Sequence, residues 1–149
     1  MELATALDFI RDQRQGILIT LKSDGRPQSS NIAYALGDDG IIRVSITDSR
    51  AKTTNMRRDP RVSLHVNRSD FYAYAVIEAE ADLAPVAAAV DDATVDELVE
   101  YYRTVAGEHP DWDEYRQAMA DQGKCVILIE PTRWSPVSRG GFPPSLFEA

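Results

Sequence analysis

The sequence has few of the residues that build disulfides and metal centres, and it lacks long apolar runs. Its single cysteine, Cys125, excludes an intrachain disulfide, and its two histidines cannot supply a histidine-rich metal site. No apolar run approaches the roughly 20 residues that cross a bilayer, and the N-terminus lacks the basic-then-apolar layout of a signal peptide. We therefore expect a cytoplasmic protein with no membrane partner and no bound metal.

Catalytic and nucleotide-binding motifs are also missing. No Gly-x-Gly-x-x-Gly follows a predicted strand, and the chain has no Walker A loop, no Gly-x-Ser-x-Gly elbow and no metal-spaced Cys/His cluster. His65, on the polar face of a predicted strand, and His109, in a loop, are each expected to be ordinary exposed or hydrogen-bonded histidines. No catalytic side chain can be named, although a bound organic cofactor can carry the reactive atom without one.

The charge is acidic overall and unevenly distributed. A chain of 149 residues with net charge −8, 44% hydrophobic and 27% charged residues fits one soluble globular domain over residues 1–149, with 136–149 as a flexible tail. The acidic balance argues against a nucleic-acid partner, because phosphate backbones require spread positive charge. Residues 78–121 hold thirteen acids against two arginines, so the elements there are expected to face away from any bound anion.

One short segment reverses this sign. Residues 50–61 contain one acid and five of the sixteen Lys and Arg residues, namely Arg50, Lys52, Arg57, Arg58 and Arg61. Asp48 or Ser49 is predicted to cap a short helix there, and Asp59-Pro60 ends it, because the residue before proline is pushed out of the α region. A helix N-terminus with arginines beside it is a candidate phosphate site. A solvated basic helix is the alternative.

Apolar periodicity predicts the remaining elements. Helices are predicted over residues 2–13, 95–105 and 112–120, the second of them capped by Asp92 or Thr94. Strands are predicted over 17–22, 27–36, 42–47, 62–67, 72–83 and 125–129, with 133–135 as an extension of the last. Glu78, Glu80 and Asp82 share one face of the long strand, and we expect that face to be solvated.

Six strands, joined mostly by tight turns, predict a mainly β fold with helices (α+β). The arrangement expected is a closed antiparallel barrel, because closure removes the edge strands that invite aggregation. Alanines occupy positions 73, 75, 79 and 81 on one face of the long strand. These small residues suit a tight barrel interior, and they would equally suit close packing against a second subunit.

Several of these segments resemble a known family. They are Gly-Arg-Pro-Gln-Ser-Ser-Asn at 25–31, Val-Ser-Ile at 44–46, the basic segment from Ser49 to Arg61, and Ala-Gly-Glu-His at 106–109 with the following 111–119. Together they resemble the pyridoxamine 5′-phosphate oxidase-like split-barrel superfamily, and within it the actinobacterial branch that uses the deazaflavin coenzyme F420. The resemblance extends to about Pro131. The tail beyond it departs from the pattern, which leaves the function of Trp134 and Arg139 open.

The resemblance implies a six-stranded antiparallel Greek-key barrel flanked by helices, which forms a homodimer with the cofactor in a groove between the subunits. It implies that Arg50, Lys52 and Thr53 hold the cofactor phosphate, with Ser49 close by and Arg57 one turn further on. The residues that it places against the ring, its edge or the ribityl chain are Gln28, Ser30, Asn31, Ser45, Ile46 and Thr47. Tyr72 and Tyr74 would wall the site from the partner subunit.

The function implied is a reductase that transfers a hydride from reduced F420 to an unsaturated small molecule, such as an enone, a quinone or a tetrapyrrole. An FMN-dependent oxidase or reductase on the same barrel is one alternative, and a flavin- or deazaflavin-binding carrier without turnover is another. The deazaflavin carries an oligoglutamate tail and so requires more positive charge than FMN. Arg57, Arg58 and Arg61 would supply that charge, unless they are solvated or paired with Asp59.

Overall fold

A computed structural model describes residues 2–136 and 138–139 of the chain. The helices are α1 (Leu3–Arg11), α2 (Ala51–Arg58), α3 (Ala93–Ala106) and α4 (Trp112–Asp121). The strands are β1 (Gln15–Leu21), β2 (Pro27–Ala33), β3 (Ala35–Leu36), β4 (Ile42–Thr47), β5 (Arg61–Asn67), β6 (Ala73–Leu83), β7 (Lys124–Trp134) and β8 (Ser138–Arg139). Most of the predicted tail, 136–149, lies outside the described residues.

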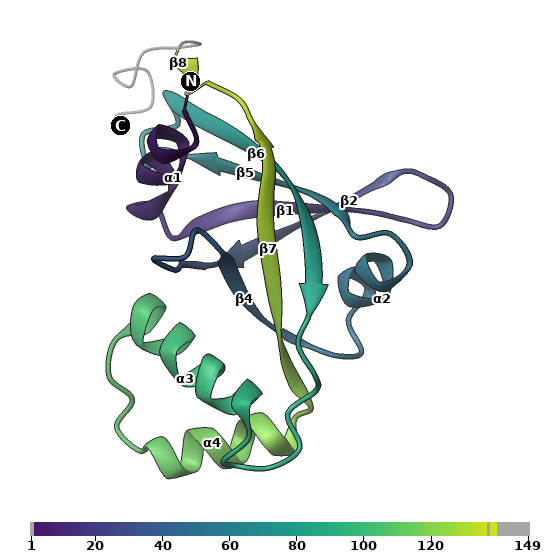
Figure 1. Ribbon diagram of the computed structural model, residues 1–149, viewed down its shortest axis with the longest axis vertical. Helices are drawn as coiled ribbons and strands as arrows, with labels where there is room; N and C mark the ends of the chain where they lie inside the picture. Colours follow the sequence, from purple (N-terminus) through teal and green to yellow (C-terminus); the bar gives the residue numbers. More distant parts are fainter. Residues whose placement is uncertain (1, 137, 140–149) are drawn as a thin grey trace, which may run out of the picture.

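The strands form one curled antiparallel sheet in the order β2-β1-β5-β6-β7-β4-β3, with β8 paired to β6 (Figure 1). The predicted strand 27–36 is interrupted at Tyr34, so that its first part pairs with β1 and its second part with β4. One continuous segment therefore belongs to both ends of the sheet. This connection closes the predicted barrel, and six of the described strands have six residues or more, as the sequence predicts.

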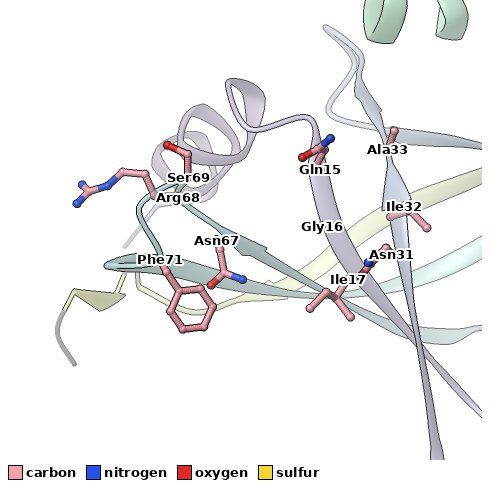
Figure 2. A pocket seen from close by; sticks show the side chains of 10 residues that line it. All are labelled: Gln15, Gly16, Ile17, Asn31, Ile32, Ala33, Asn67, Arg68, Ser69 and Phe71. Atoms are coloured by element: carbon pink, nitrogen blue, oxygen red, sulfur yellow. The ribbon is translucent and has the colours of Figure 1, made fainter. Parts of the chain in front are cut away.

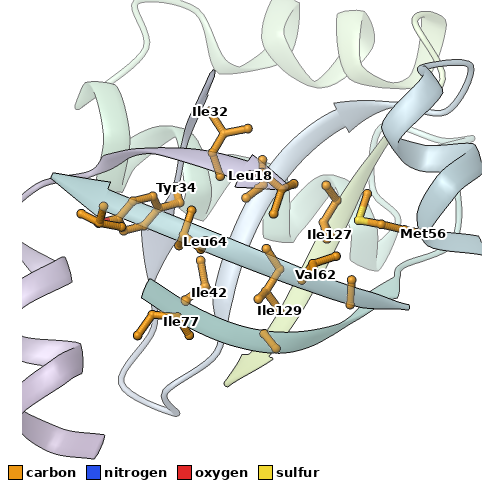
Figure 3. Close-up of a cluster of buried hydrophobic side chains, with 14 of the residues drawn as sticks. Leu18, Ile32, Tyr34, Ile42, Met56, Val62, Leu64, Ile77, Ile127 and Ile129 are labelled. Atoms are coloured by element: carbon orange, nitrogen blue, oxygen red, sulfur yellow. The ribbon is translucent and has the colours of Figure 1, made fainter. Parts of the chain in front are cut away.

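The barrel interior is filled by aliphatic side chains from all six long strands and from α1 and α2 (Figure 3). Along β6 burial alternates strictly from Ala73 to Asp82, and the four alanines lie inside the barrel with at most 9% of their surface exposed. The structure thus selects the barrel interior over a subunit contact for these alanines. Glu78, Glu80 and Asp82 are exposed on the outside, as predicted.

Tyr34 is the side chain that joins the barrel to α1. Its ring is buried, and its hydroxyl donates to the carbonyl of Ile10 in the last turn of that helix. Burial raises the pKa of Tyr34 far above its usual range, so the hydroxyl keeps its proton as a donor. The interruption of the strand at Tyr34 therefore has a packing reason that its sequence does not reveal.

The two acidic helices, α3 and α4, pack together below the barrel against β4 and β7 (Figure 1). Asp92 caps α3 by accepting from the Val95 N–H, and Asp111 caps α4 by accepting from the Glu114 N–H. His109 belongs to this unit, because its Nδ1 accepts from the Asp111 N–H at 2.9 Å and its ring contacts neighbouring aromatic rings. Within the described residues, no helix is long and apolar enough to cross a membrane.

Candidate functional site

The barrel is not hydrogen-bonded all the way round. In the described part of the chain β2 pairs with β1 alone, and β4 pairs with β3 only at Ile42 and Arg43. Residues 28–33 and 44–47 therefore each present a free strand edge, which carries N–H and C=O groups without a ladder partner. We call the region between these two edges the seam.

Two side chains from neighbouring helices reach the seam, and one of them contacts both of its edges. The Tyr101 hydroxyl, from α3, donates to the Ala33 carbonyl at 2.9 Å and is also hydrogen-bonded by the backbone of Ser45. At the other end, Lys52 Nζ lies 3.4 Å from Ser30 Oγ. Burial raises the pKa of Tyr101, so its hydroxyl stays protonated and keeps this end of the seam closed.

Helix α2 begins at the Lys52 end of the seam. Its N-cap residue is Arg50, and no side chain caps it, so the predicted capping by Asp48 or Ser49 is wrong. The physical reason is that the Asp48 carboxylate is held in an ion pair with Arg57 instead. The helix ends at Arg58, followed by Asp59 in an extended conformation, as the proline at 60 predicts.

A buried polar network attaches α2 to the β1–β2 hairpin. Asn55 Nδ2 donates to Thr20 Oγ1 at 3.1 Å and to Gln28 Oε1 at 2.9 Å. Thr53 is fully buried and donates its hydroxyl to the Thr47 carbonyl at 3.1 Å. Gln28 and Thr53, which the resemblance assigned to the cofactor, therefore have internal partners here, and their observed contacts position the helix.

We expect Asn55→Ala to lower the free energy of unfolding by about 1–3 kcal/mol, because Thr20 and Gln28 would lose a buried hydrogen-bond partner. Urea unfolding measures this effect. Thr54→Ala on the exposed side of the same helix is the matched control and should change stability by less than about 0.5 kcal/mol. Equal effects of the two substitutions would contradict the anchoring role of Asn55.

The cations at this end of the seam have no acidic partner among the described residues. Lys52 is half-buried, and its pKa is lowered first by burial and then by the nearby charges of Arg50 and Lys124. None of the ion pairs found in residues 2–136 involves these three side chains. A bound anion would relieve their repulsion, so together they form a candidate anion site.

The other basic residues of the segment are occupied. Arg57 pairs with Asp48, and Arg61 pairs with Asp59 at 2.7 Å. Arg58 donates to the Leu21 carbonyl and to Asn55 Oδ1. The positive charge that the sequence offered for an oligoglutamate tail is thus engaged within the chain.

Sequence reasoning missed Lys124. It is the first residue of β7 and lies directly opposite Thr47 in the β4–β7 register, which brings it to the anion site. The sequence did contain a signal for this residue, namely an isolated positive charge: Lys124 is the one cation between Arg116 and Arg133. Its proximity to Lys52 depends on the pairing of strands 77 residues apart in the chain, which periodicity does not predict.

The remaining predicted site residues are divided between the seam and another face. Ser45 and Thr47 are half-buried on β4, Ser49 is exposed, and the side chain of Ile46 is buried in the barrel core, which leaves only its backbone for a ligand. Ser30 faces Lys52, whereas the next residue, Asn31, lines a cavity with Ile17. The seam therefore unites only part of the predicted set.

Tyr72 and Tyr74 lie away from the seam. Strands β1 and β5 separate β6 from β2 in the sheet, so these two side chains do not join the seam of their own chain. Tyr74 is 40% exposed and stacks on His65, with ring centroids 5.0 Å apart and an interplanar angle of 6°. Tyr72 is half-buried in the turn before β6.

Comparison with known proteins agrees with this architecture. Residues 3–138 match the family described as pyridoxamine 5′-phosphate oxidase, and the chain belongs to this family. The family is one of flavin-type cofactor binders that includes oxidoreductases, which defines the class of protein but not the particular activity.

Three solved structures illustrate how broadly this fold is used. An F420 reductase is 24% identical, with a TM-score of 0.66 over 87% of this chain and 94% of that one. A FAD-binding protein from Mesorhizobium loti is 15% identical, with a TM-score of 0.64 over 90% of each chain. HutZ, a heme storage protein from Vibrio cholerae, is 17% identical, with a TM-score of 0.68 over 94% of this chain and 98% of that one. At these identities the likeness shows the fold alone.

Proposed function

We propose that this protein is a coenzyme F420-dependent oxidoreductase that reduces an unsaturated small molecule. The observation that carries the proposal is the group of three cations, Arg50, Lys52 and Lys124, with no acidic partner in the described chain, at one end of the seam. Like charges held together around a half-buried ammonium are unfavourable until an anion joins them. A cofactor phosphate is such an anion, and the guanidinium can bind it through two donors.

The seam also suits the ring of such a cofactor. Its free strand edges offer backbone donors and acceptors, and Ser45 and Thr47 add hydroxyl groups, which together match the hydrogen-bonding edge of a flavin-type ring. When bound, the deazaflavin supplies the hydride. The cations of this chain would hold its phosphate, and the free edge at residues 28–33 would position its ring.

A homodimer is part of the proposal. The outer face of β1, β5 and β6 carries Ile17, Ile19 and Val76 half-buried, with Tyr74 and Phe71 exposed beside them. A second copy covering this face would remove apolar surface from water. It would also bring its Tyr72 and Tyr74 to the cofactor, which these side chains do not reach within their own chain.

FMN is the second candidate, and one observation favours it. Because Arg57, Arg58 and Arg61 are engaged by Asp48, Asn55 and Asp59, few cations remain to hold a polyanionic tail. Three cations suffice for a single phosphate. A cofactor carrier without turnover is the third candidate function, because a heme storage protein has a similar fold.

A fluorescence titration with F420 and with FMN, on wild type and on Lys124→Ala, tests the proposal. F420 is expected to bind more tightly, and loss of Lys124 should weaken its binding about 10- to 100-fold, the worth of one charge-assisted contact. Preference for FMN, or indifference to Lys124, would contradict the F420 assignment. Binding of reduced F420 without its oxidation by an added enone would favour the carrier.

Binding of the phosphate group should depend on pH through Lys52. Its pKa in the free protein is below 10.5, and an anion bound beside it favours the ammonium and raises that pKa. Affinity is therefore expected to be full below the lowered pKa, to fall as the pH rises through it, and to be accompanied by proton uptake in that range. Calorimetry in two buffers of different ionisation enthalpy measures the uptake, which Lys52→Arg should abolish.

A further inference from the structure

Lysine is rare in this chain, which has only Lys22, Lys52 and Lys124. Lys22 is exposed in the turn between β1 and β2, away from the seam. Lys52 and Lys124 are far apart in the sequence but close in space, because the charge of Lys124 acts on the Lys52 ammonium at the anion site. Lys22 is therefore an internal reference against which the reactivity of the other two lysines can be measured.

The surroundings of Lys52 are organised by Thr47, the last residue of β4. The Thr47 carbonyl accepts from the Thr53 hydroxyl and from the Arg50 N–H, both at 3.1 Å. These two contacts attach the start of α2, which carries Lys52, to the end of β4. Lys124 lies opposite Thr47 in the β4–β7 register. The three cations are therefore grouped by strand pairing and by the attachment of α2 to β4.

The contact that Lys52 makes with β2 is a weak one. Its Nζ lies 3.4 Å from Ser30 Oγ, an uncharged partner. Asn31, the next residue of the strand, points to the other face and lines a separate cavity with Ile17 (Figure 2). Among the ion pairs of the described residues, none joins Lys52 to a carboxylate. The ammonium form of this side chain is therefore poorly stabilised in the free protein.

Poor stabilisation of the ammonium makes Lys52 a nucleophile. Burial, and then the charges of Arg50 and Lys124, lower the pKa of Lys52. A larger fraction of its amine is therefore unprotonated at neutral pH than at an exposed lysine. The unprotonated amine carries the lone pair that attacks electrophilic carbon.

The same cations attract anionic reagents. In an acyl phosphate, a phosphate group is joined through one oxygen to an electrophilic acyl carbon. When Arg50 and Lys124 bind the phosphate, the acyl carbon is brought close to Lys52 Nζ. Holding two reactants together in this way accelerates their reaction strongly.

We propose that Lys52 is a site of non-enzymatic acylation by small acyl phosphates, and that this modification disables the anion site. The Lys52 nitrogen attacks the acyl carbon and forms an amide bond. The bond between that carbon and the phosphate oxygen breaks, its electron pair leaves with inorganic phosphate, and the proton lost by the nitrogen passes to solvent. The amide is uncharged, so the site loses one of its three cations. The acylation rests on the anion site alone, whereas its effect on cofactor binding rests on the proposed function.

The test incubates the full chain, without cofactor, with acetyl phosphate and follows each lysine by mass spectrometry of chymotryptic peptides. Lys52 is expected to react at least about 10-fold faster than Lys22, because the bound phosphate places the acyl group beside it. Inorganic phosphate should slow acetylation of Lys52 and leave that of Lys22 unchanged. Acetic anhydride, which has no phosphate, should show a smaller preference for Lys52.

Two variants separate the anion site from the rest of the surface. Lys124→Ala should slow acetylation of Lys52 at least about 5-fold, because it removes a cation that binds the phosphate and that favours the free amine. Arg26→Ala, in the exposed β1–β2 turn, is the matched control and should leave the rate at Lys52 unchanged. Equal effects of the two substitutions would contradict the role of Lys124.

Equal rates at Lys52 and Lys22, faster acetylation of Lys124 than of Lys52, or no protection by inorganic phosphate would overturn the inference. Unchanged cofactor affinity after complete acetylation of Lys52 would overturn its second part, the loss of the anion site. Preferential acetylation of Lys52 in a protein that binds neither F420 nor FMN would sink the proposed function and support the acylation site. Tight binding of F420 with an unreactive Lys52 would have the opposite meaning.

Discussion

Replacement of Lys52 by glutamate is expected to weaken binding of the phosphate-bearing cofactor by at least about 100-fold. The substitution removes a charge-assisted contact, typically about 1.5–3 kcal/mol, and adds repulsion between a carboxylate and the phosphate. The new carboxylate would also pair with Arg50 and Lys124, whose charges now lower the pKa of Lys52, and would withdraw them from the ligand. Fluorescence titration at constant ionic strength measures the change.

Lys22→Glu is the control for this experiment. Lys22 is exposed in the turn between β1 and β2, so its reversal makes the same change in net charge away from the seam. It should weaken binding by less than about 3-fold, because exposed charges at a distance are screened by salt. Similar losses for the two reversals would mean that net charge, and not the anion site, controls binding.

Truncation of Ile77 to alanine is expected to lower the free energy of unfolding by about 2–5 kcal/mol. Ile77 is fully buried on β6, opposite Leu64 in the barrel interior, and its removal leaves a cavity that the closed sheet cannot collapse to fill. Urea unfolding measures the loss. Glu78→Ala, the next residue and exposed on the opposite face, should change stability by less than about 0.5 kcal/mol.

A small effect of Ile77→Ala would mean that the face of β6 that bears Ile77 and the alanines is not the barrel interior. The alternation observed from Ala73 to Asp82 makes the pair of substitutions decisive, because a slip of one residue in register would exchange their effects. The same experiment therefore checks both the core and the register that supports the site.

The sequence predicted the elements of this fold well, because each of them is encoded locally. Alternation of apolar and polar residues predicted the strands, and helical spacing from Leu3 to Ile10 predicted α1. The barrel itself also followed from the number of strands and their short turns. The break at Tyr34 was not predicted, since it depends on a buried hydroxyl that reaches a carbonyl 24 residues away in the chain.

The candidate site was predicted in part. The basic segment and the end of α2 were found, and Lys52 does lie beside Ser30 of β2. The predicted N-cap of α2 was wrong, because the Asp48 carboxylate forms an ion pair with Arg57 instead of capping the helix. Composition does not reveal this ion pair. The resemblance assigned Gln28 and Thr53 to the cofactor, and only the tertiary structure shows that Gln28 accepts from Asn55 of α2 and that Thr53 donates to the Thr47 carbonyl, contacts that position the helix.

The sequence by itself determined where charge, apolar faces and chain reversals fall, because these depend on the identity of each residue and of its near neighbours. Tertiary structure alone decided which cations share a site and which strand edges stay unpaired. The physical reason is the closure of the sheet. It places residues such as Thr47 and Lys124 side by side. The periodicity of the sequence does not predict which distant residues become neighbours.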